Sequence, residues 1–164
     1  MDNDNKNILS STALKVQDSL RSLGFDCKVI EFQESTRTSA EAAARIGCQI
    51  GQIVKSLIFR GQVSNKAVLV LTSGANRVDE GHISRYTGES IQRADAEFVR
   101  TTTGFAIGSV PPLGHVQPLE TYVDEDLLQY GNIWAAAGTS TAVFELTPDI
   151  LLMLTSGKVV RVKT

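Results

Sequence analysis

Apolar residues recur at intervals of three or four in several short segments, which is the spacing of a helix with one buried face. In the first segment this spacing joins Ala13, Val16, Leu20 and Leu23. The second covers residues 39–46, and Thr38 and Glu41 have the spacing of a capping box at its start. Three more short helices are predicted at residues 79–86, at 94–102, and from Thr147-Pro148 onward.

Short apolar or alternating runs lie between these helices and predict strands. They cover residues 27–32, 53–59, 67–71, 105–107, 121–123, 133–136, 142–146 and 159–162. A polar turn at 62–66 joins two of them in a hairpin, and only the run 67–71 has the apolar character of a strand buried on both faces. Another polar turn is expected at 124–132. Short strands mixed with short helices predict an α+β domain around a mixed, partly barrel-like sheet.

The chain has 164 residues, of which 42% are hydrophobic and 21% charged, as is typical of one soluble globular domain. We expect a disordered tail at residues 1–8 and one domain over 9–164. The N-terminus lacks the apolar core of a signal peptide, and no run of 18 apolar residues predicts a membrane span. These features predict a cytoplasmic protein without membrane contact.

The net charge of −2 and the pI near 5.7 exclude a general binder of duplex DNA, which would normally be basic. A transient contact with RNA through a local basic patch stays open. Candidates for such a patch are Arg60, Lys66, Arg77 and Arg85. Solvated surface charge is the alternative reading of the same residues.

Lys55 interrupts the apolar strand 53–59 and shares one face of it with three apolar residues, by the alternation of a strand. One interpretation is a lysine at a sheet edge whose ammonium reaches solvent. The other is a cation that points into a pocket and binds a phosphate or a carbonyl oxygen. The loop at residues 76–79 follows the next strand and could either border this site or be solvated.

Residues 108–115 contain two prolines and must form a shaped loop. Gly108 could expose backbone N–H groups that hold a carbonyl or an oxyanion, or it could simply form a turn. His115 is expected to line the same mouth as Gly108. Gly138 begins a small-residue turn that allows close approach by a ligand or by another segment.

The sequence offers no cofactor or metal motif. Its two cysteines are 21 residues apart and its two histidines 33 residues apart, so neither pair has metal-ligand spacing. GxSxG, P-loop and GxGxxG motifs are also missing from the sequence. We therefore expect neither a cofactor nor a metal.

Five segments in order resemble the YbaK/ProX-type aminoacyl-tRNA deacylases, which are related to the editing insertion domain of bacterial prolyl-tRNA synthetases. They are AAARIG at 42–47, IVKSLI at 53–58, VLVLTSG at 68–74, TGFAIGSVPPLG at 103–114 and AAG at 136–138. The resemblance covers roughly residues 12–162. It implies the family's α+β fold and hydrolysis of the ester that joins a wrongly attached small amino acid to the terminal adenosine of tRNA.

The resemblance also implies a site. Lys55 matches the family's characteristic lysine, and Gly108 and Pro112 match its glycine-x-x-x-proline loop. Lys55 would then anchor a terminal phosphate or the carbonyl, and the N–H groups of Gly108 and Ser109 would cradle the carbonyl. A ribose hydroxyl of the substrate would help to activate water. The implied catalytic residues are Lys55 and Gly108.

The implied substrate-binding residues are Ser56, Ser109, Pro112, His115 and Gly138. Ser56 and His115 stand where subfamilies differ, so the identity of the amino acid stays open. The partners implied are the acceptor end of a mischarged tRNA and an aminoacyl-tRNA synthetase. Two alternatives remain: a non-catalytic module that binds tRNA ends or a nucleotide-like ligand, and an esterase for small molecules.

Overall fold

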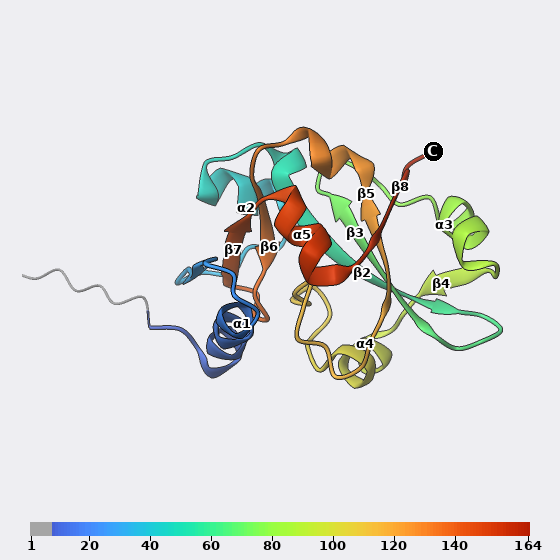
Figure 1. Cartoon of the computed structure of the whole chain (residues 1–164), viewed down its shortest axis with the longest axis horizontal. Coiled ribbons are helices and arrows are strands. Elements are labelled where there is room, and N and C mark those ends of the chain that lie inside the picture. The colour runs from blue at the N-terminus through green and yellow to red at the C-terminus, as the bar shows by residue number, and fades with distance from the viewer. Residues whose placement is uncertain (1–7) are drawn as a thin grey trace, which may run out of the picture.

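The computed structural model describes residues 8–164 (Figure 1). The tail predicted at 1–8 therefore lies, except for Ile8, outside the described residues. No helix in the described part of the chain has the length and apolar character needed to cross a membrane. The α-helices are α1 (Ser11–Ser22), α2 (Ser39–Ile46), α3 (Glu80–Thr87), α4 (Ala96–Thr103) and α5 (Pro148–Thr155).

The strands form one mixed sheet in the order β1-β7-β6-β2-β3-β5-β8, and β4 also pairs with β2. Their bounds are β1 (Val29–Glu31), β2 (Ile53–Gly61), β3 (Ala67–Ser73), β4 (Ile91–Arg93), β5 (Glu120–Asp124), β6 (Ile133–Ala136), β7 (Ala142–Leu146) and β8 (Lys158–Val160). β2 is antiparallel to β3 and parallel to β6, while β3 is parallel to β5. The predicted α+β fold with a mixed sheet is confirmed.

Strand β2 has one continuous edge and one interrupted edge. Its continuous edge pairs with β3 from Val54 to Arg60. Its other edge pairs with β6 only at Ile53 and Val54, and then with β4 only from Phe59 to Gly61. Between these two partners, residues 55–57 face a gap in the sheet. This gap places Lys55 and its neighbours at an open strand edge in the middle of the molecule.

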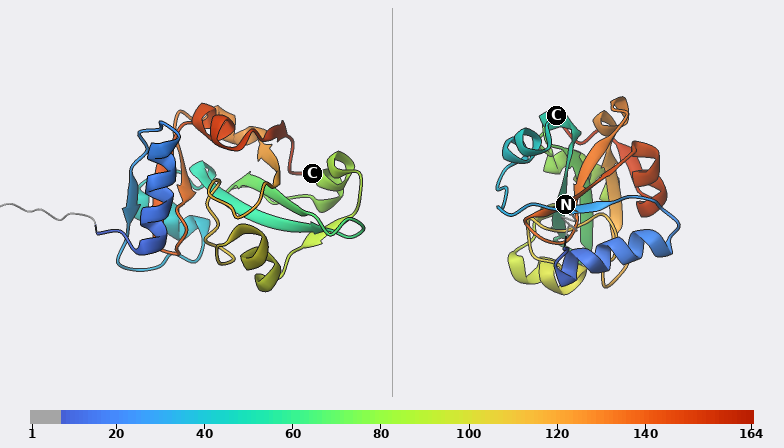
Figure 2. Two further views of the ribbon diagram at one scale, coloured as in Figure 1. Left: turned by 60° about the horizontal axis from the view of Figure 1, so that its bottom comes forward. Right: turned by 90° about the vertical axis from the view of Figure 1, so that its left-hand side faces the viewer.

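Helices cover the sheet on both faces (Figure 2), and its buried apolar residues form three clusters. The largest cluster contains Val54 and Ile58 of β2 and is covered by α1, α4 and α5. The second contains Phe59 of β2 and Ile83 of α3. The third packs α2 against Ile53. β2 contributes to all three, so its course is fixed from both sides.

Most of the predicted elements are confirmed, with bounds that shift by a few residues. All seven residues of β3 are buried, as its apolar run predicts. At α2 the N-cap is Thr38, whose Oγ1 accepts from the Glu41 amide at 3.1 Å. Glu41, however, reaches back to the amide of Arg37 at 2.9 Å instead of closing the box on Thr38.

The strand predicted at residues 105–107 is wrong. Gly104 ends α4 in the left-handed conformation, and the Phe105 amide then donates to the Thr103 side chain at 3.0 Å, so the chain turns before it can join the sheet. Sequence patterning also missed β4, whose three residues include two polar ones. Part of the polar turn predicted at 124–132 is a short 3₁₀ helix, η2 (Glu125–Gln129). A second one, η1 (Ile50–Gln52), precedes β2.

Candidate functional site

A cavity of about 510 Å³ opens at the gap beside β2. Residues 53–57 of β2 form one wall, and residues of β6, β7 and the N-terminal end of α2 form the others. Lys55, Ser56 and Gly108 all line this cavity. The volume lies in the range of sites that bind small molecules or the end of a larger ligand. The structure thus brings together three of the residues singled out in the sequence.

Lys55 is partly buried, and its ammonium donates a hydrogen bond to the backbone carbonyl of Asn76 at 3.1 Å. Burial lowers the pKa of Lys55 below its ordinary value, and the nearby positive charges of Arg93 and Arg77 lower it further. The negative charge of Asp124 opposes this shift. An ammonium group has three N–H donors, so two remain for a ligand. The loop at 76–79 lies outside the cavity lining and contacts the site through this bond between Asn76 and Lys55.

Ser56 stands between Val54 and Ile58, on the face of β2 that packs into the largest core cluster. Its Oγ atom is buried and, among the described residues, has no hydrogen-bond partner. A buried hydroxyl without a partner costs free energy unless a ligand or water supplies one. Ser56 also lines the cavity, so its hydroxyl is a candidate to bind a ligand there.

Gly108 is the third residue of a tight turn closed by a hydrogen bond from the Ser109 amide to the Ala106 carbonyl at 3.0 Å. Its φ of +84° is the value that a type II turn requires at this position. The Ser109 amide is therefore already used, which corrects the expectation that it takes part in a carbonyl cradle. Within residues 8–164 the Gly108 amide has no backbone acceptor. A Cβ atom added at Gly108 would meet no atom within 4 Å.

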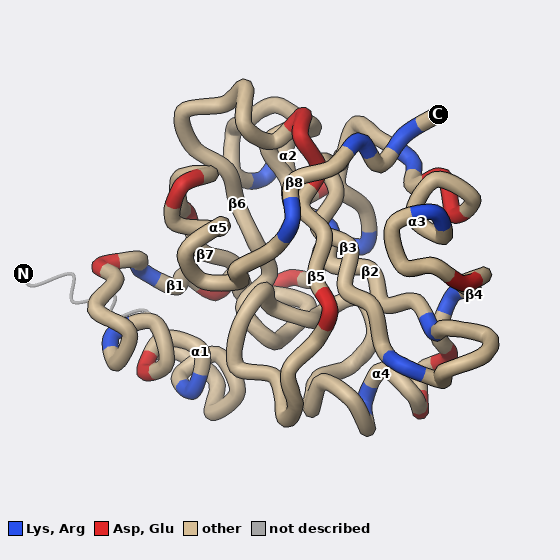
Figure 3. The backbone as a smooth tube through the Cα atoms, turned by 45° about the vertical axis from the view of Figure 1, so that its right-hand side comes forward, with Lys and Arg blue, Asp and Glu red and all other residues tan. Residues whose placement is uncertain are grey.

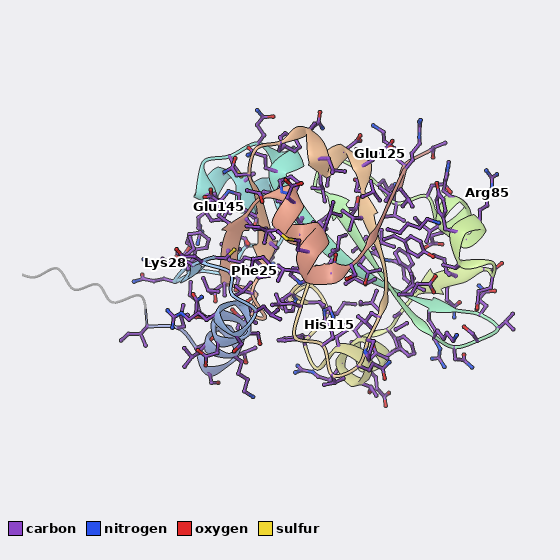
Figure 4. All side chains as sticks on the ribbon, viewed as in Figure 1. Phe25, Lys28, Arg85, His115, Glu125 and Glu145 are labelled. Carbon is purple, nitrogen blue, oxygen red and sulfur yellow. The ribbon has the colours of Figure 1, made fainter. Side chains whose placement is uncertain are left out.

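Pro112 and His115 lie elsewhere. Both line a second cavity of about 390 Å³, formed by the 112–119 loop, Leu23 and the end of α5. Figure 4 labels His115 in this loop. The His115 Nε2 atom lies 2.7 Å from the carbonyl of Pro111, and burial lowers the pKa of the imidazole. The expectation that His115 lines the same mouth as Gly108 is wrong, and Pro112 is buried as a support of the loop.

Gly138 is approached closely by other segments of the chain. Its φ is +94°, and an added Cβ would lie 2.9 Å from Thr12 Cγ2 and 3.1 Å from Phe105 Cε1. Gly138 does not belong to the cavity lining, although Thr139 and Ser140 do. Of the two possibilities for this turn, the structure favours close packing over contact with a ligand.

The charged side chains that line the cavity are Lys55 and Arg37, and both are positive. Arg37 precedes the N-cap of α2, so the positive end of a helix faces the same space. Further basic positions lie at Arg93 in β4 and at Arg161 and Lys163 in the C-terminal segment, and the backbone view colours these regions blue (Figure 3). Sequence reasoning missed Arg37; its place before the Thr38 cap was the available signal.

The cavity lining contains no Asp, Glu, His or Cys among the described residues. It therefore has no carboxylate, imidazole or thiol that could act as a general base, and no nucleophilic triad. Within the described part of the chain, no group of three or more His, Cys, Asp and Glu residues is placed to hold a metal ion. The site offers cations, hydroxyls and backbone N–H groups.

Comparisons of sequence and of fold both relate this chain to aminoacyl-tRNA editing proteins. Residues 33–154 match the family model described as the aminoacyl-tRNA editing domain. EbsC of Enterococcus faecalis, a proposed Cys-tRNA(Pro)/Cys-tRNA(Cys) deacylase, is 29% identical over 128 residues, which cover 77% of each chain. The proline–tRNA ligase of Bacillus licheniformis is 31% identical over 122 residues, which are 71% of this chain and 21% of that protein.

The fold matches a solved structure over nearly its whole length. That crystal structure is of a protein proposed to be a trans-editing enzyme for prolyl tRNA synthetase. It is 49% identical to this chain, with a TM-score of 0.91, and the match covers 96% of this chain and 99% of the other.

Proposed function

This chain belongs to the aminoacyl-tRNA editing domain family, and on that premise we propose that it is a deacylase acting in trans on mischarged tRNA. The proposed reaction is hydrolysis of the ester between a small amino acid and the terminal ribose. The resemblance to a stand-alone relative along almost the full length of both chains supports action in trans.

The cavity beside β2 is the observation that carries this proposal. Its lining combines two cations, Lys55 and Arg37, with no acidic side chain among the described residues. A phosphodiester end with an attached amino acid is a ligand that such a lining favours, because the phosphates are anionic and the α-amino group can meet hydroxyls and carbonyls. A free cationic ligand would be disfavoured by the same charges.

In the proposed mechanism Lys55 anchors a phosphate or the ester carbonyl through its two remaining N–H donors. The Gly108 amide, which has no backbone acceptor within residues 8–164, donates to the carbonyl oxygen as negative charge develops there. Water adds to the carbonyl carbon, the carbon–oxygen bond to the ribose breaks, and the ribose oxygen takes up a proton. The protein then contributes mainly position and electrostatics.

Because the described cavity lining supplies no carboxylate, imidazole or thiol base and Lys55 is assigned to anchoring, a hydroxyl of the substrate's own ribose is the proposed group that activates the water. Ser56 Oγ is the proposed partner for a polar atom of the bound amino acid, since it is buried and lacks one. The proposed substrates carry small side chains such as alanine, serine, threonine or cysteine. Size exclusion discriminates more strongly than the loss of one methylene contact, which is worth about 1–3 kcal/mol.

The test is a deacylation assay with a panel of tRNAs charged with these four amino acids and with a larger one. We expect turnover of at least one small ester, and a loss of about 10²–10³-fold in the Lys55→Ala variant. Lys28→Ala, an exposed lysine outside the cavity, is the control. Binding of tRNA ends without any turnover would instead identify a non-catalytic module. Equal turnover of free amino-acid esters would identify a small-molecule esterase.

A further inference from the structure

Lys55 is held by a loop whose own position is fixed by a polar network outside the cavity. The loop follows β3, and its Asn76 carbonyl accepts the hydrogen bond from the Lys55 ammonium at 3.1 Å. This acceptor is a backbone atom, so its position depends on the path of the loop. The path in turn depends on what the Asn76 side chain binds.

The Asn76 side chain is held between two carboxylates. Its Nδ2 atom donates to Asp124 Oδ2 at 2.8 Å and to Asp126 Oδ2 at 2.7 Å, which uses both hydrogens of the amide. Asp124 is only 1% exposed and also accepts from the Ser73 amide at 2.9 Å. A buried carboxylate with several donors is a rigid point of attachment.

The C-terminal segment also takes part in this polar network. Lys163 Nζ lies 2.7 Å from Asp126 Oδ2, the same oxygen that Asn76 binds. At the far end of the loop, the Asp79 amide donates to the Val162 carbonyl at 2.7 Å, and the Thr164 hydroxyl donates to Asp79 Oδ2 at 2.9 Å. Residues 162–164 thus contact the loop directly at Asp79 and indirectly at Asn76.

We propose that Asn76 is a positioning residue for Lys55, and that the Lys163–Asp126 ion pair keeps Asn76 in place. The chain of contacts runs from Lys163 through Asp126 and Asn76 to the Lys55 ammonium in the cavity. Neither Asn76 nor Lys163 lines the cavity, so both act through Lys55. The consequence for catalysis rests on the proposed function, whereas the positioning itself does not.

The catalytic arm of the test is a double-mutant cycle between Asn76→Ala and Lys55→Ala. If Asn76 acts through Lys55, Asn76→Ala lowers kcat/KM about tenfold in the wild-type background and has no further effect in the Lys55→Ala background. The same loss in both backgrounds would show that Asn76 supports the fold in general, and would overturn the proposal.

The second arm needs no activity. In protein labelled with ¹³C,¹⁵N-lysine, NMR follows the titration of Lys55, assigned with Lys55→Arg. Asn76→Ala should release the ammonium toward solvent, which raises its pKa toward the ordinary lysine value because the desolvation is relieved. The charged groups that act on Lys55 (Arg93, Arg77 and Asp124) are unchanged in this variant. An unaltered titration would overturn the proposal.

Lys163 supplies a milder pair of variants in case Asn76→Ala does not fold. Lys163→Ala should shift the Lys55 titration in the same direction, and Lys163→Arg should restore it because a guanidinium keeps the ion pair. Lys158→Ala, an exposed lysine of the neighbouring β8, is the control and should leave it unchanged. Equal effects of Lys163→Ala and Lys163→Arg would contradict the proposal. If no mischarged tRNA is hydrolysed, the proposed function fails while this arm still decides the positioning.

Discussion

The amide of Ser109 donates to the carbonyl of Ala106 at 3.0 Å, and this bond makes the Ser109 N–H unavailable to a ligand. It closes the turn around Gly108 and removes Ser109 from the set of free donors. Neither central amide of this turn, that of Ile107 or that of Gly108, has a backbone acceptor in the described chain, and of these two residues Gly108 lines the cavity. The proposed carbonyl cradle therefore has fewer N–H donors than the sequence suggests.

Gly108→Ala is predicted to impair deacylation by about 10²-fold, because the added methyl enters the cavity and shifts the ester from its productive position. The left-handed φ of +84° adds about 1–2 kcal/mol of strain. Gly88→Ala is a matched control, with a φ of +82°, open space at the Cβ position and a place at the end of α3. Both variants should lose similar stability in urea unfolding, but only Gly108→Ala should lose activity. Equal activities would remove Gly108 from the mechanism.

The fall in rate at alkaline pH is predicted to follow the deprotonation of Lys55. Its pKa lies below the ordinary 10.5 because of burial and the positive charges of Arg93 and Arg77. The ammonium is therefore lost at a lower pH than for an exposed lysine, and activity should fall as pH rises through this lowered pKa. Lys55→Arg should remove this fall, since a guanidinium stays protonated. Rates corrected for uncatalysed ester hydrolysis test this, and an identical fall in both proteins would refute it.

Ser56→Ala is predicted to raise the free energy of unfolding by about 1 kcal/mol, because it deletes a buried hydroxyl that has no partner. The same change should alter the relative kcat/KM for seryl, cysteinyl and alanyl esters. Ser73→Ala is the contrast, since Ser73 Oγ donates to the Gly51 carbonyl at 2.7 Å and its loss should destabilise the fold. Preserved discrimination in Ser56→Ala would exclude Ser56 from amino-acid recognition.

Gly138→Ala is predicted to destabilise the fold by about 2 kcal/mol or more while the folded fraction keeps its activity. The new methyl would press on Thr12 Cγ2 and on the Phe105 ring, and the φ of +94° adds strain. Thr12→Ser removes the opposing methyl and should recover part of the loss. Denaturant unfolding and activity per folded molecule check this prediction. An active-site role would show itself as lost activity without lost stability.

Local patterns along the chain predict most of the elements because their signals are local. Thr38 caps α2 through the nearby Glu41 amide, and the apolar run of β3 reflects burial on both faces. Strand β4 was not predicted because Gln92 and Arg93 are exposed, and only its pairing with β2 makes it a strand. The strand predicted at residues 105–107 is wrong for the opposite reason. Phe105 is a residue type that is typical of strands, but its ring packs against Gly138 and its amide donates to the Thr103 side chain.

The sequence by itself determined the family resemblance, the alternation that places Lys55 among apolar residues, and the need for a turn at Gly108. Each of these depends on residue types within a few positions. Only the tertiary structure decided which candidates meet. Lys55, Ser56 and Gly108 line the cavity that opens at the gap between β6 and β4, whereas Pro112 and His115 line another cavity. The contact of Lys55 with Asn76 likewise depends on the pairing of β2 with β3, which no local pattern specifies.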